Sequence, residues 1–187
     1  MSSDKTVTYL PDCSVSRGIG QTGECLRNCQ ACTLRRKIDD QSIPLLPGAR
    51  MTITGRCLCG AICWEASALP VVTRVCWCRE CQYIGAGSGT VNACFRTAEF
   101  TVTGQTSDYP SVADSGNQMH RRFCPSCGTP LFSEADARPH LIFVRVGTFD
   151  DPNLANPAMT IWTSSAPRWA CINAELPQVV KQPPPAA

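Results

Sequence analysis

Seven cysteines form three short clusters, and this feature constrains the chain more than any other. Thiolate sulfur is a preferred ligand of zinc, which takes four ligands in tetrahedral geometry. Seven thiols divide most simply into a group of four and a group of three. A closed four-thiolate site holds a structure together, whereas a three-thiolate site leaves one coordination position open for chemistry. The clusters are Cys57-Leu-Cys59, Cys76-Trp-Cys78-Arg-Glu-Cys81 and Cys124-Pro-Ser-Cys127.

Four of these cysteines are predicted to bind one zinc ion in a closed site. Cys124 and Cys127 flank a Pro-Ser turn, and Gly128 follows with the permissive backbone that such a zinc knuckle needs. Backbone N–H groups in the turn are expected to point at the sulfurs and to stabilise their negative charge. Cys57 and Cys59 can complete the site only if the chain bends at the glycine that follows them, because a regular strand would point them to opposite faces. The alternative for the Cys124 pair is a place in the hydrophobic core.

The second cluster supplies the remaining three thiolates from a loop of six residues. Water or a substrate sulfur is expected to complete the tetrahedron, and Glu80, which lies between two of the ligands, is expected to point away. Three thiolates give the zinc site a net charge of about −1, so the ion is a mild Lewis acid that still lowers the pKa of a bound thiol. The alternative is a closed structural site completed by Cys63 or Cys94.

The composition places these thiols in a reducing environment. The chain has 14 cysteines in 187 residues, but its N-terminus has no apolar signal segment and no stretch reaches transmembrane length. Clustered thiols in a reducing cytoplasm indicate metal binding or catalysis rather than disulfides. A net charge of +2 gives no reason to expect nucleic acid or a membrane surface as a partner.

The pattern of residues predicts a mainly β domain with little helix. β-rich runs bounded by turn formers predict antiparallel strands, with one short helical turn at 79–84. Residues 1–50 lack periodicity and are expected to form a poorly structured extension, residues 51–178 the folded zinc-binding domain, and the Pro-rich residues 179–187 a disordered tail. The expected strands cover residues 61–65, 90–95, 100–103, 141–146 and 159–163.

Several motifs, in this order, carry a resemblance to a known family. They are Gly55-Arg-Cys57-Leu-Cys59-Gly60, Cys76-Trp-Cys78-Arg-Glu-Cys81, Arg121-Arg-Phe-Cys124-Pro-Ser-Cys127-Gly-Thr-Pro-Leu-Phe132 and Gly147-Thr-Phe-Asp-Asp-Pro152. The domain from about Thr52 to Gln178 resembles the glutathione-dependent formaldehyde-activating (GFA) enzymes, also called the centromere-protein-V-like family.

The resemblance implies a β-tent fold and two zinc ions per chain. The structural zinc falls on Cys57, Cys59, Cys124 and Cys127, and the catalytic zinc falls on Cys76, Cys78 and Cys81. The implied activity is that of a carbon–sulfur lyase, which condenses formaldehyde with glutathione to give S-(hydroxymethyl)glutathione. The implied partners are therefore a small thiol and a small aldehyde, and the implied location is the cytoplasm.

Two positions depart from the family pattern. Many members carry His between the first two cysteines of both early clusters, where this chain has Leu58 and Trp77. The loss of a loop His favours an alternative function, a non-catalytic zinc-stabilised interaction module. The large number of cysteines suggests a third hypothesis, a thiol redox or metal-buffering protein.

Residues outside the three clusters receive simpler interpretations. In the extension, Cys25-x3-Cys29-x2-Cys32 has a spacing that could bind a third metal. Arg121 and Arg122 are candidates either for holding a substrate carboxylate or for stabilising the four-thiolate site. His120 is interpreted as a residue without a role in the sites. Cys63, Cys94 and Cys171 are expected in the core, and Trp64, Trp162 and Trp169 in the core or along a pocket.

Overall fold

A computed structural model describes residues 8–10 and 52–184. Strands dominate these residues, with one six-residue α-helix, α1 (Arg79–Ile84), among several 3-10 turns. The prediction of a mainly β domain with a short helical turn at 79–84 is confirmed. No helix in the described residues is long and apolar enough to cross a membrane.

The smaller sheet has four strands in the order β1-β6-β3-β2. Strands β2 (Ile53–Arg56), β3 (Cys63–Ala66) and β6 (Phe100–Thr103) pair antiparallel. Strand β1 (Thr8–Leu10), which belongs to the segment expected to be poorly structured, pairs in parallel with β6. The remaining residues of the predicted extension, including the cysteines proposed for a third metal, lie outside the described residues.

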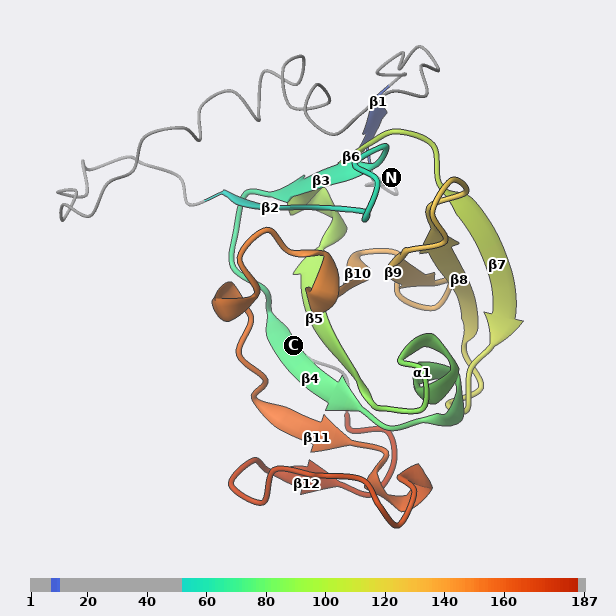
Figure 1. The fold of residues 1–187 in the computed structure, drawn as a ribbon, viewed down its shortest axis with the longest axis vertical. Helices are drawn as coiled ribbons and strands as arrows, with labels where there is room; N and C mark the ends of the chain where they lie inside the picture. Colours follow the sequence, from blue (N-terminus) through green and yellow to red (C-terminus); the bar gives the residue numbers. More distant parts are fainter. Residues whose placement is uncertain (1–7, 11–51, 185–187) are drawn as a thin grey trace, which may run out of the picture. The chain divides into compact units, whose positions relative to one another are not determined.

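The larger sheet has eight strands in the order β12-β11-β4-β5-β10-β9-β8-β7 (Figure 1). Its pairs are antiparallel except at β4-β11 and β11-β12, which are parallel. Helix α1 lies between the β5 side and the β7–β8 side of this sheet. The strands are β4 (Val72–Cys76), β5 (Thr90–Arg96), β7 (Ser107–Val112), β8 (Gln118–Phe123), β9 (Pro130–Ala135), β10 (Leu141–Arg145), β11 (Met159–Ile161) and β12 (Gln178–Val179).

Five strands of the larger sheet were not predicted from the sequence, namely β4, β7, β8, β9 and the two-residue β12. Strands β7 and β8 show no regular alternation of buried and exposed residues, so their sequence has no strand period to detect. Long antiparallel ladders between β7, β8 and β9 hold them in the sheet. The expected strand at 159–163 ends early, because Trp162 adopts a left-handed conformation with φ of 58° and a 3-10 turn, η5 (Thr163–Ser165), follows.

An aromatic cluster joins the two sheets. Trp64 lies 4.8 Å from Phe149 and 5.3 Å from Phe100 between ring centroids, and Phe100 lies 5.8 Å from Phe132. Trp64 and Phe100 come from the smaller sheet, and Phe132 comes from β9 of the larger one. The Trp64 indole N–H also donates to Thr148 Oγ1 at 3.1 Å, so its polar atom is satisfied inside the core.

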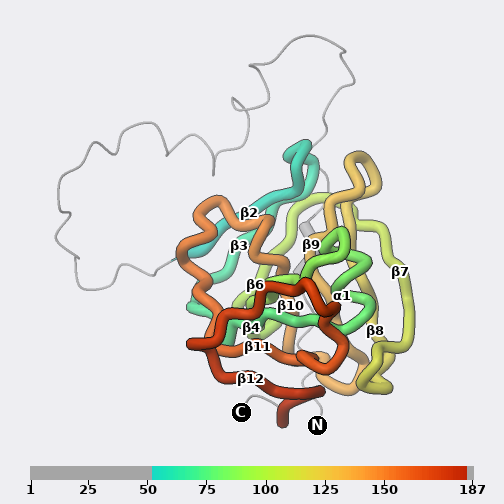
Figure 2. Tube along the Cα trace, turned by 60° about the horizontal axis from the view of Figure 1, so that its bottom comes forward, coloured from blue at the N-terminus to red at the C-terminus, as the bar shows by residue number. Residues whose placement is uncertain are grey.

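The C-terminal segment packs against the domain beyond residue 178, where the sequence placed the domain boundary. The backbone N–H of Trp162 donates to the Lys181 carbonyl, and that of Ser164 donates to the Val180 carbonyl, both at 3.3 Å. The Trp162 indole N–H donates to Gln182 Oε1 at 3.2 Å. Residues 179–182 of the expected disordered tail are therefore paired with β11 and the segment that follows it (Figure 2).

Candidate metal centres

Two turns far apart in the sequence bring four sulfurs together. Cys57 and Cys59 follow β2, and Cys124 and Cys127 follow β8, yet the four Sγ atoms all lie within 4.8 Å of one another. The Cys57–Cys59 and Cys59–Cys124 Sγ distances are 3.5 and 3.7 Å. Tetrahedral zinc with Zn–S bonds of about 2.3 Å requires sulfurs about 3.8 Å apart. The set of four donors and its spacing therefore fit one zinc ion.

The backbone of each turn explains how the sulfurs converge. Gly60 has φ of 76° and donates its N–H to the Cys57 carbonyl, and Gly128 has φ of 72° and donates to the Cys124 carbonyl. Both glycines thus provide the left-handed bend that the sequence predicted. The N–H of Ile62 donates to Cys57 Sγ at 3.3 Å, as expected for a metal knuckle.

The acidities of these thiols show how closely they interact. The hydroxyl of Thr129, which lies 3.0 Å from Cys127 Sγ, lowers the pKa of Cys127 to about 5. The Ala61 N–H lowers the pKa of Cys59, but burial and the neighbouring thiols outweigh it and raise that pKa to about 12. Burial likewise raises the pKa of Cys57. Repulsion between neighbouring thiolates disfavours ionisation of all four cysteines at once, and a bound divalent cation would offset this repulsion.

The second cluster gathers three sulfurs at the start of α1. Cys76 ends β4, Cys78 is the residue before the helix and Cys81 lies in its first turn, and their Sγ atoms lie within 4.8 Å of one another. Among the described residues neither Cys63 nor Cys94 joins this group. The amide of Gln82 fixes the loop, because its Nε2 donates to the Trp77 carbonyl at 2.7 Å and to the Ser165 carbonyl at 2.8 Å.

One of the three thiols is far more acidic than the others. Hydrogen bonds from the Cys76 and Cys78 thiols, together with the positive charge of Arg145, lower the pKa of Cys81 to about 2. Hydrogen bonding to Cys78 and Cys81, together with burial, raises the pKa of Cys76. The triad therefore favours a single thiolate at Cys81, and a divalent cation would favour ionisation of all three thiols.

A chain of polar side chains supports Cys81. The Asn92 amide nitrogen contacts Cys81 Sγ at 4.0 Å and donates to Thr90 Oγ1 at 3.0 Å. Arg145 donates to the Asn92 carbonyl oxygen, and through its other terminal nitrogen to Ser133 Oγ at 2.6 Å. Sequence analysis missed Asn92, Ser133 and Arg145. Asn92 and Arg145 were polar residues on predicted strands, which is too common a signal to identify a site, and Ser133 lies on β9, which was not predicted.

The triad opens into a cavity of about 120 Å³ on one face of the larger sheet. Strand register aligns its walls: Arg74, Asn92 and Arg145 are consecutive partners across β4, β5 and β10. A neighbouring row runs from Val72 through Cys94, Phe143 and Ser133 to Arg121. All of these residues line the cavity, together with the three thiols, whereas the four-cysteine cluster lies outside it.

Glu80 corrects a sequence prediction. Its side chain was expected to point away from the ligands, but it lines the cavity. One Glu80 carboxylate oxygen, Cys78 Sγ and one Asp114 carboxylate oxygen lie within 4.8 Å of one another. The Glu80 Oε2 atom is buried and has no hydrogen-bond partner among the described residues. Glu80 lies in the first turn of α1, and the turn between β7 and β8 brings Asp114 to the same end of this helix, where Asp114 accepts the Arg79 N–H at 3.1 Å.

The remaining predicted residues divide between the core, the cavity and the surface. Cys94 is buried as expected and lines the cavity, and Cys63 is half-buried. Cys171 and Trp169 were expected inside but are exposed, because the segment after η5 forms turns rather than a strand. Trp64 is buried in the core, and Trp162 is buried at the cavity.

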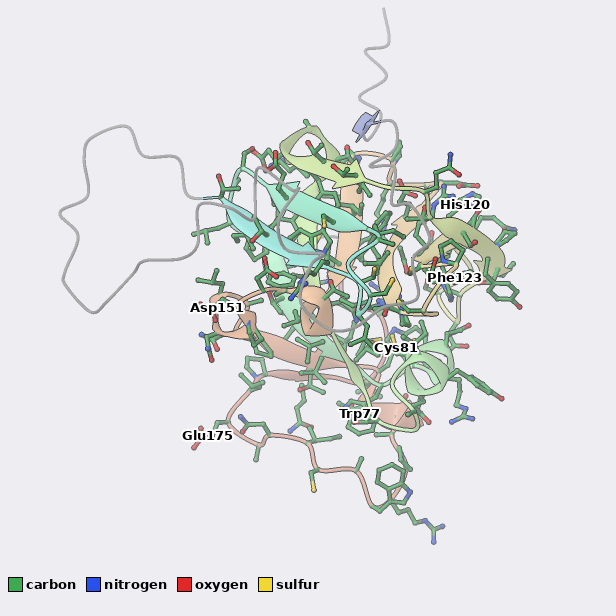
Figure 3. The ribbon with its side chains drawn as sticks, turned by 45° about the horizontal axis from the view of Figure 1, so that its top comes forward. Trp77, Cys81, His120, Phe123, Asp151 and Glu175 are labelled. Atoms are coloured by element: carbon green, nitrogen blue, oxygen red, sulfur yellow. The ribbon has the colours of Figure 1, made fainter. Side chains whose placement is uncertain are left out.

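The histidine and arginine candidates follow the alternation of β8. His120 lies away from Cys81 (Figure 3) and pairs with Asp108 at 2.5 Å and Asp136 at 3.3 Å. Arg122 pairs with Glu134 at 2.9 Å. Arg121 points to the other face of the strand and lines the cavity. Of the two arginines, Arg121 is therefore the one that can reach a ligand beside the triad.

Comparisons with known proteins define the class. The sequence pattern of the family described as glutathione-dependent formaldehyde-activating enzyme matches residues 52–165, which is more than half of the chain. The chain belongs to this family. Among solved structures, a Rhodobacter sphaeroides protein is 23% identical, with a TM-score of 0.44, over 56% of this chain and 91% of that one. A comparison with curated proteins gives no significant match.

Proposed function

We propose that the protein is a zinc-dependent carbon–sulfur lyase, which adds glutathione or a similar thiol to formaldehyde or another small aldehyde. One observation carries this proposal. The sulfurs of Cys76, Cys78 and Cys81 line a cavity that can admit a small molecule, whereas the four-cysteine cluster does not. A three-thiolate site beside a cavity has the open position that catalysis at zinc requires.

We assign one zinc ion to each cluster. Cys57, Cys59, Cys124 and Cys127 would hold a structural ion, and the three cavity cysteines would hold a catalytic one. When bound, the catalytic ion supplies a Lewis acid that favours the thiolate form of a substrate thiol.

The protein's own residues prepare the cavity for this chemistry. Arg145 places a positive charge beside Cys81 and offsets the negative charge of three thiolates. Asn92 holds Cys81 on one side, and Gln82 fixes the loop on the other. The cavity confines the thiol and the aldehyde together, and proximity supplies much of the acceleration that such an addition needs.

The reaction balances without any oxidant or reductant. The thiol loses its proton, its sulfur forms a bond to the aldehyde carbon, and the carbonyl π pair moves to the oxygen, which takes up a proton to become the hydroxyl of the adduct. The reverse reaction breaks the same carbon–sulfur bond and releases the aldehyde. The lyase activity therefore requires only a position for the sulfur and a source of protons, which solvent in the cavity can supply.

A non-catalytic zinc-stabilised module is the second candidate, and one observation favours it. Trp77 stands where many members carry His, and its side chain is only 4% exposed and is not among the cavity-lining residues. This position therefore supplies no proton-transfer group to the cavity. A module of this kind would hold zinc without accelerating adduct formation.

One experiment separates the two candidates. The metal-loaded full chain is mixed with glutathione and ¹³C-formaldehyde, and exchange into the hydroxymethyl adduct is followed by NMR. The lyase proposal expects a rate above the uncatalysed background, lost in Cys81→Ala and kept in Cys63→Ala, which removes a thiol outside both clusters. A wild-type rate equal to background, with two zinc ions bound, would support the module instead.

We also propose that the protein works in the reducing cytoplasm with small molecules as its partners. The ten cysteines that the structure describes are all free thiols, and both clusters need reduced thiols to bind metal. Oxidation of either cluster would release its ion, so an oxidising compartment would be incompatible with the proposed activity.

A further inference from the structure

The cavity beside the triad carries more positive than negative charge. Four arginines line it: one each from β4, β8 and β10, and one from the turn after β9. Only two carboxylates line it, those of Glu80 and Asp114. A divalent cation in the triad would leave that site with a net charge of about −1, which still leaves the lining positive. The four arginines are Arg74, Arg121, Arg138 and Arg145.

Arg74, Arg121 and Arg138 have no carboxylate partner among the described residues; Arg145 has none either, but it donates to Asn92 and Ser133. Within residues 52–184, the ion pairs of the structure involve Arg56, His120 and Arg122. The contrast on β8 is direct, because Arg122 pairs with two carboxylates on one face of the strand, whereas Arg121 faces the cavity without any. A positive group that faces an enclosed space without a counter-charge is ready to bind an anion.

Arg74 is the most constrained of the three. It is half-buried, and its Nε atom is enclosed without a hydrogen-bond acceptor. Arg138 lines the same cavity as Arg74, so both guanidinium groups face the space that a ligand beside the triad would occupy. An anion bound there would supply the hydrogen-bond acceptor that Arg74 Nε lacks and a counter-charge for both groups.

The position of Arg74 relates this anion to the reacting sulfur. Arg74 and Cys76 are two residues apart on β4 and both line the cavity, so they lie on the same face of the strand. Their Cα atoms are therefore separated by about 6.6 Å along the strand. A ligand whose sulfur reaches the triad can place a carboxylate several bonds away at Arg74.

We propose that Arg74 and Arg138, with Arg121, form a carboxylate-binding subsite that selects thiols bearing carboxylate groups over neutral thiols. The proposal rests on the proposed function, because it assumes that the triad receives a thiol. It goes beyond that function in assigning the discrimination between thiols to these three arginines. A planar guanidinium group binds a carboxylate through two parallel hydrogen bonds, which lysine cannot reproduce.

The test measures binding without reaction. S-methylglutathione has two carboxylates but no free thiol, and its dimethyl ester has the same shape without those charges. Calorimetric titration of the zinc-loaded full chain should show that the dicarboxylate binds at least roughly tenfold more tightly than its dimethyl ester, because the ester removes the charged partners of the enclosed arginines. In Arg74→Gln or Arg138→Gln this preference should largely disappear. Arg122→Gln, which changes the other face of β8, should retain it.

Two further measurements keep the result interpretable. Arg74→Lys keeps the charge but loses the planar fork, so it should bind the dicarboxylate with intermediate affinity, and zinc content with thermal unfolding shows whether each variant is folded. Equal affinity for the dicarboxylate and its ester, or unchanged affinity in both glutamine variants, would overturn the proposal. Binding of inorganic phosphate as tight as that of the dicarboxylate would overturn it in favour of a general anion site.

Failure of the proposed function gives a different result. If arginine-dependent binding of the dicarboxylate is found but no thiol forms an adduct above background, the lyase proposal fails and the subsite stands. If adducts form equally fast with glutathione and with neutral thiols such as 2-mercaptoethanol, the lyase proposal stands and the subsite fails.

Discussion

Replacement of Asn92 by Leu should weaken metal binding at the triad while sparing the four-cysteine cluster. The change removes the amide that contacts Cys81 Sγ at 4.0 Å and the carbonyl oxygen that accepts from Arg145. Residues that orient metal ligands in this way typically contribute 10- to 100-fold to metal affinity. This range corresponds to about 1.4–2.7 kcal/mol of binding free energy. We expect the lower part of the range, because the contact with sulfur is long.

The assay is a competition titration of Co²⁺ and Zn²⁺ against a chromophoric chelator, with the cobalt–thiolate absorption reporting on each class of site. In Asn92→Leu the affinity for one metal equivalent should fall and the affinity for the other should be unchanged, because Asn92 contacts the triad and not the four-cysteine cluster. Asn92→Asp keeps the acceptor for Arg145 but loses the donor to Cys81, so it separates the two contributions. Asn117→Ala, which removes an exposed amide bonded to Ser115, is the control. An affinity of the triad unchanged within twofold, or equal weakening of both sites, would refute the reasoning.

Three further predictions concern stability. Cys59→Ala should release one zinc equivalent and markedly lower the thermal unfolding midpoint, because it opens the cluster that joins the turn after β2 to the turn after β8. An unfolding midpoint unchanged in calorimetry would contradict this. Trp64→Phe should cost about 1 kcal/mol or more in urea unfolding, since it removes the indole bond to Thr148 and part of the core packing. The hydrogen bond to Asp108 raises the pKa of His120 above 6.5. Its stabilisation is therefore fully present below pH 6.5 and disappears as pH rises through the raised pKa, and His120→Asn should flatten this dependence in pH-resolved unfolding.

The sequence indicated the two sets of candidate metal ligands because the two cysteine pairs and the triad are each local, although only the fold brings Cys57 and Cys59 together with Cys124 and Cys127. Cysteines two or three residues apart around a turn bring their sulfurs together whatever the rest of the fold does, and the glycine after each pair supplies the required bend. The division into four and three followed from ligand counting and agrees with the groups that the structure forms. The short helix at 79–84 and the mainly β character were also readable, because both depend on local propensity and turn residues.

The tertiary structure alone decided what surrounds the triad. Arg74, Asn92 and Arg145 become neighbours because β4, β5 and β10 pair in one register, and a shift of one residue would turn each side chain to the opposite face of the sheet. The same alternation sends Arg121 into the cavity and Arg122 to the carboxylates outside it. No local pattern encodes this register, since it depends on contacts between segments far apart in the chain. The sequence by itself therefore determined where metal can bind, and the packing of the strands decided which charges a substrate would meet there.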